Sequence, residues 1–421
     1  MSQYIPSLDR VPRIERRAQQ IDDPVARLRY LRKEMSVPPA RVVPVAARHR
    51  RSTPGFKRAA RRAARRAIWL AFPLMMAISG PASKGVPETV AKERGMLVPR
   101  ADAGVVTAPV PQVWRVEHSE STDVYSNGLR VDLTFVVNNR PRGHYPVYAL
   151  AGASEPVATG DAPVGIVYHT TESHLAPFEE DENRRLKQLG RNLLEVIRTA
   201  RAYHYVIDRF GRVFAVVAET DAANHVGNSV WADAHGIYVN LNDSFLGVSF
   251  EGQTDAPDQV TPAQVASGRV LTEMLRSRYN IAAEDCVTHA QVSVNPDNML
   301  IGSHVDWASN FPFREMGLPD NYSIPLASIY AFGFEYDGTF LRVTGDRWKG
   351  LELAANQVDR QAALEGVPVA RYRTILRHRY KDIAAALKQK SAQEARATLS
   401  GAVTKPPAAV RESKDTIEGA I

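Results

Sequence analysis

The sequence lacks features that mark several classes of protein. It has one cysteine, Cys286, in 421 residues, which excludes a disulfide bond within the chain but does not exclude export. We find no internal repeat. The apolar run from Ala67 to Ile78 is too short for an ordinary membrane-spanning helix. Hydrophobic residues nevertheless make up 44% of the chain, so a chain of this length can bury a sizeable core in two or three domains.

The net positive charge comes from the first part of the chain. Residues 1–83 contain 18 Lys and Arg against 5 Asp and Glu, whereas the remainder contains 35 against 41. The formal net charge of +7 therefore misdescribes the body of the protein, which is weakly acidic. Charge gives no support for a nucleic-acid partner, and we expect none.

Three segments make up the N-terminal part. Residues 1–66 are expected to be a basic, flexible extension rich in Arg, Pro and Ala. In residues 67–83 an apolar run follows arginines and precedes small residues, which is the order of a secretory signal. Signals normally begin a chain, so either the true start lies downstream or residues 67–79 are an uncleaved membrane anchor; a buried helix is the third interpretation. Residues 84–110 form a linker.

The rest of the chain predicts an α/β fold, with a mixed central β-sheet flanked by helices. Residues 111–160 are expected to be a β-rich lead-in, with two antiparallel strands in 113–139 joined by a turn at 126–128. The main domain is placed at 161–318. Its strands are expected at 164–169, 202–217 (a hairpin) and 245–252, and its helices at 182–200 and 261–279.

After the main domain the sequence predicts a small accessory α+β region at 319–391. Residues 331–343 resemble a hairpin around Asp337 and Gly338, and two helices follow. Residues 392–421 are polar and rich in alanine, and we expect a disordered tail. These segments show no residues with an evident chemical role.

Two histidines stand at strand ends far apart in the sequence. His169 ends the buried strand that begins at Val164, and His289 follows the apolar residues from Cys286. Either histidine alone is as well explained by a structural role. Two imidazoles carried to one edge of a sheet, however, are the beginning of a zinc site.

Several motifs in the middle third follow one another in the order of a known family. The segments are VYHTTES, AYHYVIDRFGRVFAVV, ANHVGNS, FLGVSFEG and VTHAQVS. Together they resemble the zinc amidase and peptidoglycan-recognition family, which includes phage lysozyme-type amidases. The resemblance covers neither residues 1–110 nor 320–421.

This resemblance implies zinc at one edge of a mixed sheet. It also implies hydrolysis of the amide bond between N-acetylmuramic acid and L-alanine in peptidoglycan, with peptidoglycan or its muropeptides as partner. A protein with that substrate and a signal-like segment is expected to be exported, to the periplasm or cell envelope. In such enzymes zinc keeps an open position for water, lowers the pKa of that water and polarises the carbonyl.

Tyr203 is our first candidate for the group that stabilises the oxyanion, because it occupies the hairpin tyrosine position of the family. Glu251 is the second candidate, two residues beyond Ser249 on the same strand face. Ser249 itself stands where some amidases of the family carry a glutamate. His204 is expected to be a packing histidine, and His225 either lines the groove or bonds to its own loop.

The third zinc ligand is where the sequence departs from the family. The usual aspartate or cysteine before Pro-Gly is missing from the loop after His289. The candidates are His304, Asp306 and Asp297. We prefer His169, His289 and His304 as the zinc ligands, with Asp306 orienting a ligand imidazole. Asp297 lies in an Asn-Pro-Asp-Asn turn, where aspartate is ordinary turn chemistry.

Two other classes of function stay open on the sequence. A recognition module that has lost its metal would bind muropeptides without cutting them. A structural protein of the cell envelope, tethered by its apolar segment, would bind no peptidoglycan. The presence of a third zinc ligand would distinguish an enzyme from the recognition module.

Overall fold

The computed structural model describes residues 111–254, 260–345 and 348–403. The segments expected at 1–66, 67–83 and 84–110 lie outside the described residues. So does the proposed anchor at 67–79. Within the part of the chain that is described, no helix combines the length and the apolar character needed to cross a membrane.

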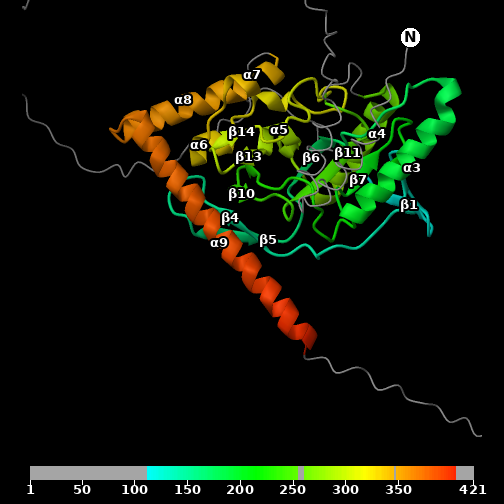
Figure 1. Cartoon of the computed structure of the whole chain (residues 1–421), viewed down its shortest axis with the longest axis horizontal. Helices are drawn as coiled ribbons and strands as arrows, with labels where there is room; N and C mark the ends of the chain where they lie inside the picture. The colour runs from blue at the N-terminus through cyan, green and yellow to red at the C-terminus, as the bar shows by residue number, and fades with distance from the viewer. Residues whose placement is uncertain (1–110, 255–259, 346–347, 404–421) are drawn as a thin grey trace, which may run out of the picture. The chain divides into compact units, whose positions relative to one another are not determined.

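The central sheet is mixed, as the sequence predicts. Its strand order is β1-β2-β3-β8-β7-β11-β6-β12. The strands β7, β11, β6 and β12 run parallel to one another (Figure 1), whereas β7 and β8 form an antiparallel hairpin. Their bounds are β1 Arg115–His118, β2 Thr122–Tyr125, β3 Arg130–Asp132, β6 Gly165–Thr170, β7 Tyr205–Ile207, β8 Val213–Ala215, β11 Phe245–Phe250 and β12 Cys286–Thr288.

One helix covers each face of this sheet. Helix α4 (Pro262–Tyr279) buries Leu271, Met274 and Leu275 in a cluster that includes Ile166 and Tyr168 of β6. Helix α3 (Asn183–Ala200) packs against the hairpin strands β7 and β8 on the opposite face. Because side chains alternate along a strand, β6 presents Tyr168 to α4 and His169 to the other face.

A capping box fixes the start of α4. The Thr261 hydroxyl accepts a hydrogen bond from the Gln264 backbone N–H, and the Gln264 side chain accepts one from the Thr261 N–H. Pro262 occupies the first turn, where its missing N–H costs no hydrogen bond. These contacts confirm the helix start expected from the sequence.

Smaller elements pack against strands β6, β11 and β12 of this sheet. A second sheet has the order β5-β4-β10-β9, and a two-stranded hairpin pairs β13 with β14. The bounds are β4 Tyr145–Tyr148, β5 Pro156–Gly160, β9 Val230–Ala232, β10 Ile237–Val239, β13 Val294–Asn295 and β14 Leu300–Ile301. Short helical segments are η1 Glu180–Glu182, η2 Ala283–Asp285, α5 His289–Val292 and η3 Asn321–Ser323.

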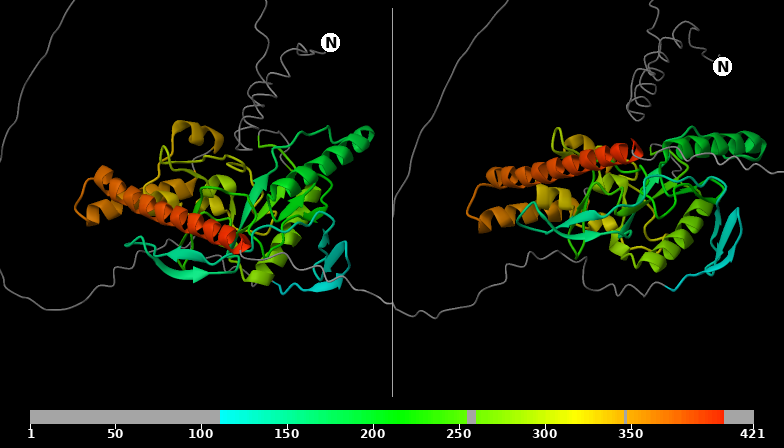
Figure 2. Two further views of the ribbon diagram at one scale, coloured as in Figure 1. Left: turned by 60° about the horizontal axis from the view of Figure 1, so that its bottom comes forward. Right: turned by 90° about the horizontal axis from the view of Figure 1, so that it is seen from below.

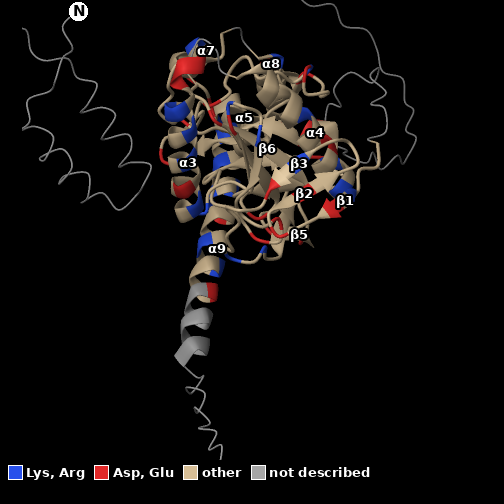
Figure 3. Cartoon of the chain, turned by 90° about the vertical axis from the view of Figure 1, so that its right-hand side faces the viewer, with Lys and Arg blue, Asp and Glu red and all other residues tan. Residues whose placement is uncertain are grey.

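The C-terminal region packs as four helices on the main domain. They are α6 Ala327–Phe332, α7 Gly338–Val343, α8 Lys349–Leu364 and α9 Val369–Val403. Their apolar side chains share one cluster with β9, β10, β13 and β14. Figures 1 and 2 show α9 running past the hairpin of β4 and β5, where Arg379 donates to the carbonyl oxygens of Ala149 and Leu150. Basic and acidic residues are interspersed on α3 and α9 (Figure 3).

Three expectations differ from the structure. The hairpin expected at 331–343 is wrong, because Gly333 ends α6 in the left-handed region and Asp337 caps α7 by accepting from Thr339 and Phe340 N–H groups. The described residues after 319 therefore contain helices and no strand.

The tail expected to be disordered from residue 392 is helical as far as Val403, which agrees with its alanine content. Between residues 113 and 139, β1, β2 and β3 form three strands where two were expected.

Candidate active site

Adjacent parallel strands bring the two predicted histidines together. Thr288 of β12 pairs with Tyr168 of β6, so the next residues, His289 and His169, are neighbours at the same sheet edge. Both side chains are buried, and their ring centroids lie 4.5 Å apart. The prediction from the two strand ends placed these residues correctly.

Asp306 completes a cluster with these histidines. It lies in the loop after β14, and its backbone carbonyl accepts from the Ala290 N–H at 3.2 Å. Its Oδ1 lies 2.8 Å from Nδ1 of His289, and its Oδ2 lies 3.2 Å from Nδ1 of His169. One donor atom from each of the three residues falls within 4.8 Å of the others, as a metal ion would require.

The electrostatics of the cluster suit metal ligands. Burial and the imidazole of His289 lower the pKa of His169 to about 4, so His169 is neutral at neutral pH. Burial alone would raise the pKa of Asp306, but His289 and His169 hold it well below its usual range. A neutral imidazole and an ionised carboxylate are the forms that bind a divalent cation.

His304 and Asp297, the other candidates for the third ligand, occupy different places. The ring of His304 stacks on that of His289, with centroids 4.5 Å apart and planes 17° apart, yet His304 is not part of the three-residue group. Asp297 is exposed in the turn between β13 and β14, where its N–H donates to Asn295. The ligand role of His304 stays a prediction.

His225, for which the sequence left open either a place lining the groove or a bond to its own loop, lies against His169. Its Nδ1 lies 3.1 Å from Nε2 of His169, on the side away from Asp306. A hydrogen bond there keeps the proton of His169 on Nε2 and leaves Nδ1 available as a ligand. Burial, followed by the neighbouring histidines, lowers the pKa of His225 well below its usual value, so it can accept this bond. The only signal in the sequence was its His-x-Gly motif.

A glycine on the neighbouring strand makes room for His225. A Cβ at Gly247 of β11 would lie 2.7 Å from the imidazole ring. The loop is held from the other side, where Oδ1 of Asn242 accepts from the N–H groups of His225 and Val226. His204 is fully buried, with its ring bonded to the Gly247 N–H and the Asp221 carbonyl, as expected of a packing histidine.

Tyr203 lies beside the cluster in a strained backbone conformation. Its ring centroid is 5.0 Å from that of His169, and its φ is 59°, which is uncommon for a residue with a side chain. Burial first, and then the charge of Asp306, raises the pKa of the phenol well above its usual value. Tyr203 therefore keeps its proton at neutral pH and can donate a hydrogen bond.

The carboxylate of Glu251 is engaged elsewhere. It is buried, and its Oε2 accepts from the Arg209 backbone N–H at 3.1 Å. Burial raises the pKa of this carboxyl group. Glu251 is not part of the metal-competent group, and its catalytic role stays a prediction.

Glu172, which sequence analysis did not identify, joins two segments near the cluster. Its Oε1 accepts from the hydroxyl of Thr170 at 2.7 Å and from the Thr254 N–H at 2.8 Å. These bonds tie the end of β6 to the segment after β11. A non-glycine φ of 51° at Glu172 shows that the turn is constrained.

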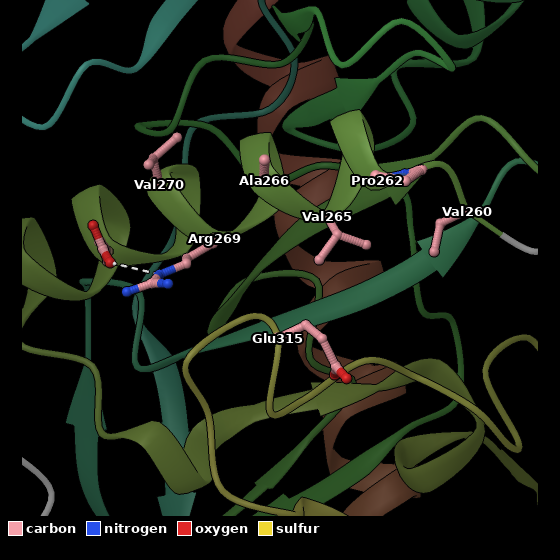
Figure 4. Close-up of a pocket in the computed structure, with 8 residues that line it drawn as sticks. Val260, Pro262, Val265, Ala266, Arg269, Val270 and Glu315 are labelled. Carbon is pink, nitrogen blue, oxygen red and sulfur yellow. Dashed lines mark hydrogen bonds and ion pairs between the residues drawn. The ribbon is translucent and has the colours of Figure 1, made fainter.

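A separate hollow lies on the outer side of α4, away from this cluster (Figure 4). It has a volume of about 750 Å³, and its walls include Val265, Arg269 and Glu315. Arg269 is paired with Glu273 at 3.3 Å. Because α4 covers the sheet face opposite His169, this hollow is not part of the active site.

Comparison with known proteins agrees with the position of the cluster. The family model described as N-acetylmuramoyl-L-alanine amidase matches residues 159–306, a range that contains His169, His289 and Asp306. No curated protein matches the chain.

The solved structures that this chain matches include three amidases. The N-acetylmuramoyl-L-alanine amidase LysC from Clostridium intestinale is 21% identical over 43% of this chain and 93% of its own, with a TM-score of 0.25. AmpDH3 from Pseudomonas aeruginosa, in complex with an anhydromuramic pentapeptide, is 22% identical over 37% of this chain and 58% of its own, with a TM-score of 0.28.

AmiD from E. coli, an N-acetylmuramyl-L-alanine amidase in complex with its substrate, is 21% identical over 38% of this chain and 58% of its own, with a TM-score of 0.28. The family assignment rests on the sequence match and on the residues that the fold brings together within it. Residues 159–306 of this chain are a domain of the N-acetylmuramoyl-L-alanine amidase family.

Proposed function

We propose that the chain hydrolyses the amide bond between N-acetylmuramic acid and L-alanine in peptidoglycan, with zinc bound by His169, His289 and Asp306. The observation that carries the proposal is the convergence of these three side chains inside the matched domain. In this proposal Asp306 is the third ligand, in place of His304, which we preferred from the sequence.

The residues present fit a zinc ion. Two imidazole nitrogens and one carboxylate oxygen form a common catalytic donor set, which leaves a fourth position for water or substrate. Zinc in such a site lowers the pKa of a water molecule and polarises the scissile carbonyl. Nε2 of His289 is buried without a hydrogen-bond partner among the described residues, and the Nδ1 atoms of both histidines face Asp306.

The chain's own residues provide the rest of the chemistry. Tyr203 keeps its proton and stands beside His169, where its hydroxyl can donate to the oxyanion that develops on the carbonyl. His225 holds the orientation of His169 through the bond to Nε2. Glu172 ties Thr170, the residue after His169, to Thr254 in the segment after β11.

Zinc content of purified variants tests the ligand assignment. We expect one zinc per unmodified chain and its loss in Asp306→Ala, because removing a carboxylate leaves two protein ligands. His304→Ala and Asp297→Ala are matched controls from the same loop and should keep zinc. Full occupancy in Asp306→Ala with loss in His304→Ala would return the assignment to His304. An unmodified chain that binds no zinc would favour a binding module that does not cut.

We also propose that the chain is exported to the cell envelope. The support is the substrate, which lies outside the cytoplasmic membrane, and the signal-like order of residues 67–83. Fusing residues 1–100 to a reporter that is active only outside the cytoplasm should give a signal. A silent but well-expressed fusion would contradict export, and replacing residues 67–79 with a polar segment is the control.

A further inference from the structure

A groove lies between α9 and the chain segment that carries two of the proposed zinc ligands. Its volume is about 630 Å³. One wall comes from α9, which is outside the matched amidase domain. The other wall comes from β13, the turn that follows it and the start of the loop after β14, together with two asparagines. The groove therefore exists because the C-terminal helices pack on the amidase domain.

Helix α9 provides an apolar floor and a polar end. Tyr380 is buried at the base, and Ala384 and Leu387 are partly buried above it. Lys388 and Ser391 follow one turn later and are exposed. This stretch of α9 is held in place by Lys390, which donates to the His144 carbonyl at 2.9 Å.

The opposite wall is built on the segment between His289 and Asp306. Val294 extends the apolar floor, and Asn295 and Asp297 line the turn above it. Ser303 borders the groove next to His304, whose ring stacks on His289. A molecule in the groove would thus lie along the same segment that carries the cluster.

Two exposed asparagines complete the lining. Asn228 belongs to the loop that carries His225, and its carbonyl accepts from the Val294 N–H at 3.1 Å. Asn240 lies on the neighbouring strand end, bonded through its N–H to the Ser229 carbonyl. The polar lining of the groove therefore consists of amide and hydroxyl side chains, together with Lys388 and Asp297, whose opposite charges cancel.

This lining fits a neutral chain of N-acetylated sugars. Amide and hydroxyl side chains match sugar hydroxyls and N-acetyl groups, while the apolar floor can receive the less polar faces of the sugar rings. The balanced charge gives a polyanion no advantage. We propose that the groove binds the glycan strand of peptidoglycan beyond the sugar at which the amide is cut. This proposal rests on the proposed function, because that function supplies the substrate.

A neutral, uncleavable oligosaccharide separates this proposal from amidase activity. Tetra-N-acetylchitotetraose contains no lactyl amide, and its binding to the full chain can be followed by isothermal titration calorimetry. We expect binding that falls at least tenfold in Ser391→Trp, where the indole fills the groove, and measurably in Asn228→Ala. Gln389→Trp, exposed on the same helix but outside the groove, is the matched control. Circular dichroism checks that each variant folds.

Steady-state kinetics on two substrates provide a second test of the groove. For polymeric peptidoglycan, KM should rise about tenfold in Ser391→Trp, whereas turnover of a short N-acetylmuramoyl tripeptide, which does not reach the groove, should be unchanged. The proposal would be wrong if the unmodified chain did not bind the oligosaccharide. It would also be wrong if Ser391→Trp and Gln389→Trp bound it with equal affinity. Failure to cleave the tripeptide would instead overturn the proposed function, and the calorimetry would still decide the groove.

Discussion

At the scale of single residues, Tyr203 is the side chain on which the chemistry beyond the metal depends. Replacing it with phenylalanine removes one hydroxyl and leaves the ring that packs beside His169. Loss of one oxyanion donor typically lowers kcat about 100-fold or more, on the order of 3 kcal/mol. We therefore expect Tyr203→Phe to reduce kcat by about this factor while KM and zinc content stay unchanged.

Zinc analysis and steady-state kinetics on the same preparation check this expectation. Tyr205→Phe on the next strand is a suitable control, because that phenol bonds Glu219 and lies among the residues packed against α4. Unchanged turnover in Tyr203→Phe would move the catalytic role to Glu251. The corresponding experiment is then Glu251→Gln, which keeps the size of the side chain and removes its charge.

The site residues differ in how far the sequence could predict them. His169 and His289 follow runs of buried strand residues, so their place at one sheet edge could be inferred. Asp306 and His304 stand two residues apart in an irregular loop, where no periodicity says which side chain turns inward. The position of Asp306 depends on long-range contacts, such as the bond from the Ala290 N–H. The sequence left two interpretations of His225 open, because its contact with His169 joins segments that are far apart in the chain.

At the scale of elements, helices and strands with a buried face were predicted correctly from their apolar periodicity. Prediction failed where a residue type is common in two kinds of local structure. The helices α3 and α4 and the strands β6 and β11 follow from their apolar periodicity and from the Thr261 cap. Asp337-Gly338 was interpreted as a hairpin turn, but aspartate is as good a helix cap as a turn residue. The fold of the surrounding helices decides between the two, and a short sequence window does not contain that information.

At the scale of the whole molecule, the C-terminal helices are an integral part of the structure around the site. Their apolar side chains share a cluster with Ala290 of α5 and with Ile301 of β14, on either side of the turn between His289 and Asp306. The sequence suggested a plain accessory region, because contacts between distant segments leave no local pattern. These helices support the loop that carries Asp306 and, with it, form the groove assigned to glycan.

The proposed activity is the hydrolysis of one defined bond. The most direct measurement is mass spectrometry of a muropeptide incubated with the full, zinc-loaded chain, with Asp306→Ala as the inactive comparison. We expect two products, a sugar with a free lactyl carboxylate and a peptide with a free N-terminal L-alanine, which together gain one water, and neither product with Asp306→Ala. Cleavage at another bond, or binding of the muropeptide by the zinc-loaded chain without either product, would contradict the proposed activity.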